Sequence, residues 1–296
     1  MPIIELKDVS KLYGFGDATT LALDEVSLSI EEGEFVAVMG PSGCGKSTLM
    51  NIIGLLDRPT HGEFMLGGRK VARMTPSRAA RIRRDTIGFI FQSFNLLPRL
   101  TALENVALPL TYRTNMSQTK RLKQASSILE RVGMQEREYF LPGQLSGGQV
   151  QSVAIARALV NNPKLIIADE PTGNLDSNGS RLVMELLSEI HKMGNTILFV
   201  THNPELTRYA NRVIYMHDGQ IIQDEKSVIG QVAVTALRGM YKARKMTEED
   251  DLAGVSALMK AKPHKDTKPV RKRKPVPKKS STTRRRPGKY SKAAKK

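Results

Sequence analysis

A glycine-rich loop near the start of the chain carries the clearest chemical pattern. Its residues, Gly40-Pro41-Ser42-Gly43-Cys44-Gly45-Lys46-Ser47-Thr48, fit G-x-x-x-x-G-K-[ST]. Glycines let backbone N–H groups converge on an anion, and the start of the following helix adds partial positive charge. Lys46 has the reach for the β- and γ-phosphates of a nucleotide, and the Ser47 hydroxyl is suited to hold Mg²⁺. The loop therefore predicts a nucleoside triphosphate site in which Cys44 is a small filler and not a nucleophile.

Four side chains suited to phosphoryl transfer stand where apolar runs end. Gln92 follows the run 87–91, Asp169 and Glu170 end the run 164–170, and His202 ends the run 196–202. Each run is typical of a buried strand, and open α/β sheets bind ligands at the carboxyl ends of their strands. We therefore expect the four side chains to meet the glycine-rich loop at one edge of a sheet.

The four residue types match the needs of a metal-assisted hydrolysis. Asp169 is suited to hold Mg²⁺ through water, and Gln92 to bridge Mg²⁺ and the attacking water. A carboxylate such as Glu170 can orient or deprotonate that water, while His202 can donate to the γ-phosphate. Taken singly, each has an ordinary alternative, such as a strand cap for Asp169 or a turn for His202. Together with the loop at 40–48 they indicate hydrolysis.

Two further features extend this pattern. Leu145-Ser146-Gly147-Gly148-Gln149 precedes a helical stretch over 150–160, and Ser146 is a good N-cap. The segment predicts a second anion-binding helix start in the same chain. Tyr13 offers an aromatic face on which an adenine ring can stack, although an ordinary core or surface role explains an isolated tyrosine better.

The elements that must position these residues alternate between apolar runs and helical patterns. The helix after the glycine-rich loop is predicted from one apolar face, formed by Leu49, Ile52, Ile53 and Leu56. Short strands are expected at 3–6 and 26–30, and a helix over 180–192. Such alternation predicts an α/β fold with a mainly parallel core sheet. Residues 93–160 are mostly helical in pattern, which predicts an inserted helical subdomain.

The whole chain of 296 residues sets limits on compartment and charge. Cys44 is the only cysteine, so no internal disulfide forms and we expect a reducing compartment. The first residues lack a basic region before an apolar stretch, and no run reaches the ~18 apolar residues of a membrane span, so we expect neither signal peptide nor anchor. Residues 262–296 hold sixteen Lys or Arg and one Asp, a net +15 of the total +17. Residues 1–261 are nearly neutral.

Three segments follow from these patterns. Residues 1–224 form the α/β body, and residues 225–261 form an extension with two helix candidates, the second beginning at Thr247. Residues 262–296 are too poor in apolar side chains to offset ordering entropy, so we predict a disordered basic tail.

The motifs, in this order and spacing, resemble those of ATP-binding cassette (ABC) ATPases. They are the aromatic loop at Tyr13, the phosphate loop at 40–48, the glutamine loop at Gln92, the signature motif at 145–149, the acidic strand at 165–170, the dimer-contacting loop Gly173-Asn174-Leu175-Asp176 and the switch histidine His202. The resemblance covers residues 3–224. It implies ATP and Mg²⁺ as ligands, and a P-loop NTPase cassette in which antiparallel N-terminal strands accompany the mainly parallel sheet.

The finer pattern resembles the macrolide- and lipoprotein-exporter branch of that family. It rests on the segments 56–60, 91–98 and 100–106. The resemblance implies a cytoplasmic subunit, peripheral on the inner face of the cell membrane, that hydrolyses ATP to power a membrane permease. It also implies a head-to-tail homodimer, in which each ATP lies between the Gly40 loop of one chain and Ser146, Gly147, Gly148 and Gln149 of the other.

Two positions depart from the family pattern after the signature motif. The family usually reads Gln-x-Gln-Arg-Val-Ala, whereas Ser152 replaces the arginine here and Val150 replaces a commonly polar residue. Serine cannot supply the rigid charged donors of arginine, so we expect altered coupling between the helical subdomain and the nucleotide. The intact phosphate loop should preserve binding. A regulatory ATP-binding module with weak hydrolysis is therefore one alternative.

The basic tail raises a second alternative, a soluble cassette ATPase that acts on nucleic acid through residues 262–296. Proteins of that kind generally carry two cassettes or a long coiled-coil insertion, and neither is present here. The tail can also be an extension without a role or a tether to anionic lipid. We favour lipid over nucleic acid, because each Lys or Arg near a charged leaflet gains ~1 kcal/mol.

Overall fold

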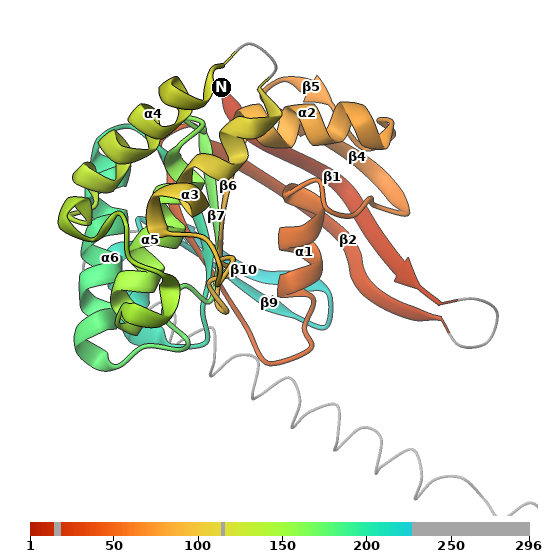
Figure 1. The fold of residues 1–296 in the computed structure, drawn as a ribbon. Helices are drawn as coiled ribbons and strands as arrows, with labels where there is room; N and C mark the ends of the chain where they lie inside the picture. Colours follow the sequence, from red (N-terminus) through yellow and green to blue (C-terminus); the bar gives the residue numbers. More distant parts are fainter. Residues whose placement is uncertain (15–18, 114–115, 227–296) are drawn as a thin grey trace, which may run out of the picture. The chain divides into compact units, whose positions relative to one another are not determined.

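The structure, a computed structural model, describes residues 1–14, 19–113 and 116–226, which form two sheets and the helices around them (Figure 1). The first sheet holds β1 (Pro2–Tyr13), β2 (Thr20–Glu31), β4 (His61–Leu66) and β5 (Arg69–Lys70) in the order β2-β1-β4-β5. All of its pairs are antiparallel, as the resemblance implied for the N-terminal strands.

The second sheet forms the centre of the fold. It holds β3 (Phe35–Met39), β6 (Ile87–Phe91), β7 (Leu165–Asp169), β8 (Thr196–Val200), β9 (Arg212–His217) and β10 (Gln220–Lys226) in the order β10-β9-β3-β8-β7-β6. Only the β9–β10 hairpin is antiparallel. The predicted mainly parallel core sheet is therefore confirmed.

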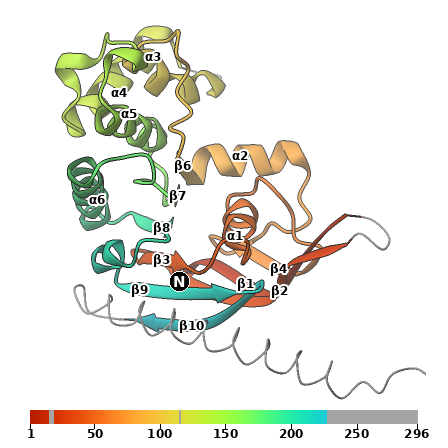
Figure 2. The ribbon, with the colours of Figure 1, turned by 90° about the horizontal axis from the view of Figure 1, so that it is seen from below.

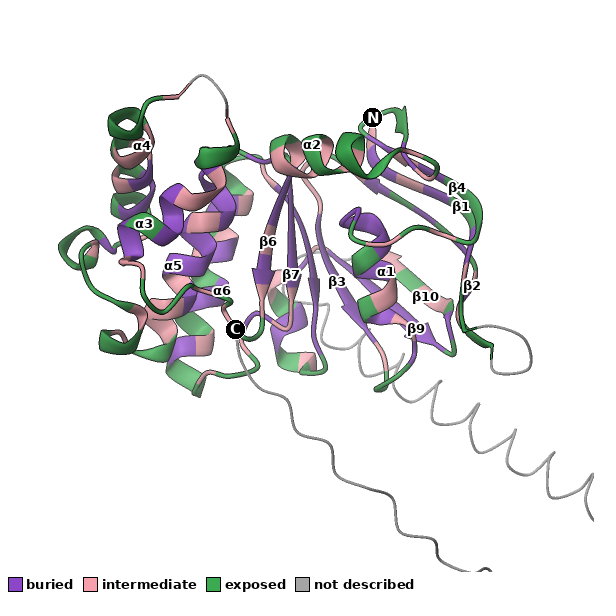
Figure 3. Ribbon diagram, turned by 45° about the vertical axis from the view of Figure 1, so that its right-hand side comes forward, coloured by how far each residue is buried: buried purple, intermediate pink, exposed green. Residues whose placement is uncertain are grey.

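Alternate side chains of the central strands face two hydrophobic cores. In β3, Phe35 and Ala37 belong to one core, while Val36 and Val38 belong to the other. Both faces must therefore be covered, which explains the continuous apolar runs in the sequence. Figure 3 shows the central strands and much of α5 as buried.

Helices and the first sheet cover the two faces of the central sheet. The helices are α1 (Lys46–Ile53), α2 (Pro76–Thr86), α3 (Ala102–Ala107), α4 (Gln118–Arg131), α5 (Gly147–Leu159) and α6 (Ser177–Lys192). Helix α1 and the first sheet share one core, and α3 to α6 share the other. Helices α3, α4 and α5 lie together in Figure 2, as expected for a helical subdomain. Among the described residues, every helix is too short or too polar to cross a bilayer.

Local details differ from the sequence-based expectation. Helix α1 ends at Ile53 because Leu55 turns to a φ of 56°, so Leu56 is 49% exposed and does not share the buried face. Leu182 of α6 is likewise exposed at 52%. Helix α2 was not expected, and it has no buried residue that an apolar pattern could reveal. The helix candidate at Thr247 and the tail over 262–296 lie outside the described residues.

Candidate nucleotide site

The loop between β3 and α1 makes turns that require glycine. Gly40, Gly43 and Gly45 have φ values of 149°, 83° and 97°. A Cβ on Gly40 would lie 2.2 Å from the Met216 carbonyl oxygen, so a larger residue would displace the backbone. Gly45 is the N-cap of α1, and no side chain caps the first N–H groups of this helix. Those N–H groups are therefore available to an anion.

Lys46 closes the loop on itself. Its Nζ donates to the Gly40 carbonyl at 3.0 Å and the Pro41 carbonyl at 2.7 Å, and lies 3.7 Å from Cys44 Sγ. Phosphate oxygens can take the place of these carbonyl oxygens, so the loop fits a nucleotide phosphate. Burial raises the pKa of the Cys44 thiol against the opposing charge of Lys46. Cys44 therefore suits packing and not nucleophilic attack, as the sequence indicated.

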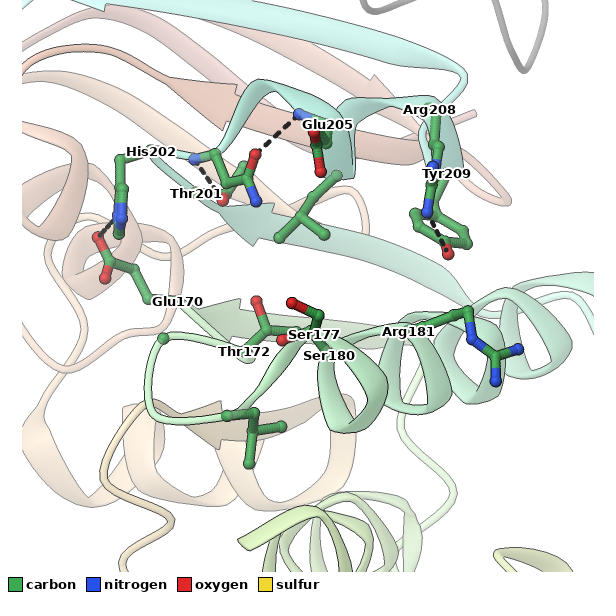
Figure 4. Close-up of a pocket in the computed structure, with 14 residues that line it drawn as sticks. Glu170, Thr172, Ser177, Ser180, Arg181, Thr201, His202, Glu205, Arg208 and Tyr209 are labelled. Atoms are coloured by element: carbon green, nitrogen blue, oxygen red, sulfur yellow. Dashed lines mark hydrogen bonds and ion pairs between the residues drawn. The ribbon is translucent and has the colours of Figure 1, made fainter.

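The carboxyl ends of β3, β8, β7 and β6 meet at one edge, because these strands are successive neighbours in the sheet. Glu170 follows β7 with a φ of 45°, and its N–H donates to the Val200 carbonyl at 3.1 Å. Its Oε1 lies 3.1 Å from Nδ1 of His202. Figure 4 shows these two side chains directed toward each other in a cavity of about 250 Å³. Left-handed backbone at a non-glycine residue costs ~1–3 kcal/mol and clusters at functional sites.

The charge of the Asp169 carboxylate is influenced by burial and by the charges of Glu170 and Lys46. Burial raises the pKa of Asp169, the charge of Glu170 raises it further, and Lys46 opposes both. A half-buried carboxylate between a second acid and a lysine is suited to a cation. In the described part of the chain, no three His, Cys, Asp or Glu side chains are grouped to hold a metal alone. A Mg²⁺ ion at this edge would therefore need phosphate oxygens besides Ser47, Gln92 and Asp169.

Gln92 follows β6 and packs against the loop that comes after Glu170. A Cβ on Gly173 would lie 2.6 Å from Gln92 Nε2, so a larger residue would displace the Gln92 side chain. Asn174 Nδ2 donates to the Gln92 carbonyl at 3.0 Å. The segment 173–176, predicted as a dimer-contacting loop, thus also holds the glutamine loop of its own chain.

The signature segment is well formed but lies away from the phosphate loop. Ser146 is the N-cap of α5, and it exchanges hydrogen bonds with Gln149 in a capping box, as predicted. A groove of about 610 Å³ beside it includes Gly147 and Asn174 but no residue of 40–48. Helices α5 and α1 lie in different parts of the molecule in Figure 2. One chain therefore does not bring both anion-binding segments onto a single phosphate in this arrangement.

Tyr13 ends β1 and stands beside the phosphate-loop helix. Its hydroxyl donates to Asp57 Oδ2 at 2.7 Å, and Lys11 Nζ lies 4.8 Å from its ring centroid. Burial and the Asp57 hydrogen bond raise the pKa of Tyr13, while the adjacent Thr48 lowers it. The residue is 40% exposed, which leaves room for a base to stack on the ring.

One side chain that holds the site was missed in the sequence. Gln151 of α5 donates from Nε2 to the Pro171 carbonyl at 2.6 Å, one residue beyond Glu170. Ser152, where the family pattern has arginine, donates to the Gly148 carbonyl at 3.0 Å and so turns back on its own helix. Hydrophobic periodicity carries no signal for the Gln151 contact, because it joins a helix to a loop 20 residues away in sequence.

Comparisons with known proteins agree on one family. The model of the ABC transporter family matches residues 23–173. The macrolide export ATP-binding/permease protein MacB of Hyphomonas neptunium is 51% identical over 223 residues, which are 75% of this chain and 34% of that protein. The uncharacterized ABC transporter ATP-binding protein MJ1508 of Methanocaldococcus jannaschii is 53% identical over 221 residues, 75% of this chain and 98% of that protein.

A solved structure shows the same arrangement of elements. The structure is that of the cassette MJ0796 as a dimer in a post-hydrolysis state, bound to ADP and Pi, and it aligns with a TM-score of 0.69 at 48% sequence identity. The alignment covers 75% of this chain and 98% of the MJ0796 chain. The site geometry, the family model and these relatives lead to one conclusion. The chain belongs to the ABC transporter family, as one of its ATP-binding cassettes.

Proposed function

We propose that this chain is the ATP-hydrolysing subunit of an exporter-type transporter, and that it works as a head-to-tail dimer beside a membrane permease. The observation that carries the proposal is the placement of Lys46, Glu170 and His202 at one edge of the central sheet, while the groove beside the signature segment contains no residue of the phosphate loop. A nucleotide on the phosphate loop needs a second chain to supply Ser146. The dimeric form of MJ0796 supports this reading.

The residues of the sheet edge divide the work of hydrolysis between them. Lys46 exchanges its loop carbonyls for the β- and γ-phosphates. Glu170 orients or deprotonates the attacking water, and His202, at 3.1 Å, fixes that carboxylate and donates to the γ-phosphate. Ser47, Gln92 and Asp169 are the proposed ligands of Mg²⁺, which when bound stabilises charge on the phosphate oxygens.

The second chain completes the proposed site. Its Ser146 hydroxyl and the N–H groups of Gly147, Gly148 and Gln149 would face the γ-phosphate across the interface. Tyr13 of the first chain would stack on the adenine. The exposed start of α5 supports the first role, and the partly exposed ring of Tyr13 supports the second.

A groove between α2 and α5 offers a place for the permease. Its volume is about 780 Å³, and its lining combines aromatic side chains with arginines and contains no acid; the residues that carry this character are Phe89, Phe91, Tyr112, Arg81, Arg84 and Arg157. We propose that a cytoplasmic permease segment with acidic side chains and an apolar anchor binds here. The MacB relative, whose name joins an ATP-binding part and a permease in one protein, supports a permease as the occupant.

Purification from native membranes tests the function and the groove together. An integral membrane permease should co-purify with the chain. We expect this association to hold the chain at the inner face of the membrane. Arg81→Glu should weaken the association without loss of ATP hydrolysis. Arg78→Glu, three residues earlier on α2 and outside the groove, is the matched control. Recovery of nucleic acid in place of a permease would contradict the proposal and support the nucleic-acid alternative.

A further inference from the structure

We infer that Arg157 is a positioning residue that holds the glutamine loop and, through it, Gln92. The inference deepens the proposed ATPase function and rests on it. Arg157 lies near the end of α5, the helix that begins at the signature segment. Its guanidinium group reaches across to the loop after β6, which is more than 60 residues away in sequence.

Two hydrogen bonds define this contact. Arg157 Nη2 donates to the Phe94 carbonyl at 2.8 Å, and Nη1 donates to the Asn95 carbonyl. The guanidinium is half-buried, and carbonyl oxygens satisfy its charge there. A planar group with several fixed donors suits two adjacent carbonyls, and lysine cannot reproduce this geometry.

The loop held by Arg157 needs an outside restraint. Phe94 and Asn95 have φ values of 59° and 52°, so two consecutive non-glycine residues adopt left-handed backbone. Left-handed backbone is unfavourable for a bulky residue such as Phe94, although asparagine adopts it more readily. The loop would relax to another shape if the two charge-assisted hydrogen bonds were removed, and Gln92 lies only two residues before Phe94.

Helix α5 therefore joins two parts of the proposed site. Its start carries Ser146, which we propose faces the nucleotide of the second chain, and its end holds the loop that carries Gln92 of its own chain. Asn174 restrains the Gln92 carbonyl from the other side. A shift of α5 on engagement of the second chain would move the Phe94–Asn95 turn and so reposition Gln92.

Hydrogen–deuterium exchange of the nucleotide-free protein tests the restraint directly. Arg157→Met keeps most of the side-chain volume but removes both hydrogen bonds, so segment 92–97 should exchange faster. Arg113→Met is the matched control, because Arg113 is also half-buried and bonds to Asn161 through its side-chain and backbone oxygens. Equal exchange of segment 92–97 in wild type and Arg157→Met would overturn the inference whether or not the chain hydrolyses ATP.

A double-mutant cycle tests whether Arg157 acts through Gln92. Arg157→Met should lower kcat about tenfold or more, because small displacements of a metal-side ligand are costly, with ATP affinity nearly unchanged. Adding Gln92→Ala should cause little further loss, since Arg157 is inferred to act only by positioning the Gln92 side chain that this second change removes. Arg113→Met should instead combine additively with Gln92→Ala. Additive losses for Arg157→Met and Gln92→Ala would show a merely structural role and overturn the inference, whereas an inactive wild type would contradict the proposed function.

Discussion

Lys46 is hydrogen-bonded to its own loop. Its ammonium group uses the carbonyls of Gly40 and Pro41, and these are the contacts that phosphate oxygens must replace. The exchange of neutral acceptors for charged ones favours the bound state, because the attraction between the ammonium and phosphate charges adds to the hydrogen bonds. The side chain thus holds the loop and is placed to contact a nucleotide.

Replacement of Lys46 by alanine should weaken nucleotide binding and cause turnover to collapse, because the cation facing the β- and γ-phosphates is lost. The measurements are equilibrium binding of ATP and the rate of phosphate release. Lys164→Ala, an exposed lysine paired with Glu32, is the control and should behave as wild type. Unchanged turnover in Lys46→Ala would mean that the Gly40 loop is not the catalytic site.

Sequence alone predicted the types and strand-end positions of the site residues but not their mutual restraints. Two acids were expected to end the strand over 164–170, whereas in the structure the strand ends at Asp169 and Glu170 follows it with left-handed backbone. The contact of Tyr13 with Asp57 joins residues 44 positions apart. Such pairs depend on how the elements pack, so no local pattern reveals them.

At the scale of elements, two helices begin with the same device. Ser146 caps α5 and Thr101 caps α3, and each forms a capping box with the residue three positions later. The two caps have the same chemistry, but only the first belongs to the signature segment. Comparison of variants at the two caps can therefore distinguish the contribution of a cap to folding from a contribution of Ser146 to function.

Ser146→Ala and Thr101→Ala should each lower the free energy of unfolding by about 1 kcal/mol, the usual value of an N-cap. Only Ser146→Ala should also reduce ATP-driven dimerisation and turnover. Thermal unfolding and ATPase assays on both variants provide the comparison. An equal loss of turnover in the two variants would indicate that Ser146 acts only as a helix cap.

A buried ion cluster joins the two sheets. Arg212 of β9 contacts Asp224 at 2.6 Å, Glu34 at 2.8 Å and the Ser29 carbonyl of β2 at 2.7 Å. Burial raises the pKa of Glu34, but hydrogen bonds from Lys226 and Arg212 outweigh it and hold the pKa below the ordinary 4.5. The cluster therefore ties the end of strand β10 to β9 and to the first sheet.

The lowered pKa of Glu34 predicts how stability depends on pH. The unfolded chain binds this proton more readily, so the stabilisation is complete above pH 4.5 and is lost as pH falls through the lower folded pKa. Arg212→Met should cost about 3 kcal/mol at pH 7 and flatten this acid limb. Thermal unfolding from pH 7 to 3.5 measures both effects, with the exposed Arg181→Met as control. Parallel pH profiles for wild type and Arg212→Met would contradict the assignment.

The apolar patterns predicted the buried elements better than the exposed ones. Strands β3, β6, β7 and β8 were found because both of their faces are covered and their residues are almost all apolar. Helix α2 was missed because it carries four arginines, and its apolar side chains Ala79 and Ile82 are only partly buried. Strands β1 and β2 each extend to 12 residues, well beyond the expected 3–6 and 26–30, because their pairing continues through irregular register with polar residues outward.

At the scale of the whole chain, the net charge is concentrated in residues 262–296. A chain ending at Ala261 should keep its basal ATPase rate, because every proposed nucleotide residue lies before it. It should lose binding to phosphatidylserine-containing vesicles at low salt, since each Lys or Arg near an anionic surface contributes ~1 kcal/mol. Equal vesicle binding by both chains would remove the lipid proposal, and tail-dependent binding only to DNA or RNA would support the nucleic-acid alternative.

The central claim is that two chains share each ATP and that Glu170 handles the attacking water. Glu170→Gln keeps the shape of the side chain but cannot accept the proton of that water. Sedimentation of this variant with ATP and Mg²⁺ tests the claim most directly. We predict a stable dimer that retains ATP, absent when Lys46→Ala is added, together with turnover reduced to a small fraction of wild type. A Glu170→Gln variant that stays monomeric with ATP, or hydrolyses it at the wild-type rate, would contradict the account.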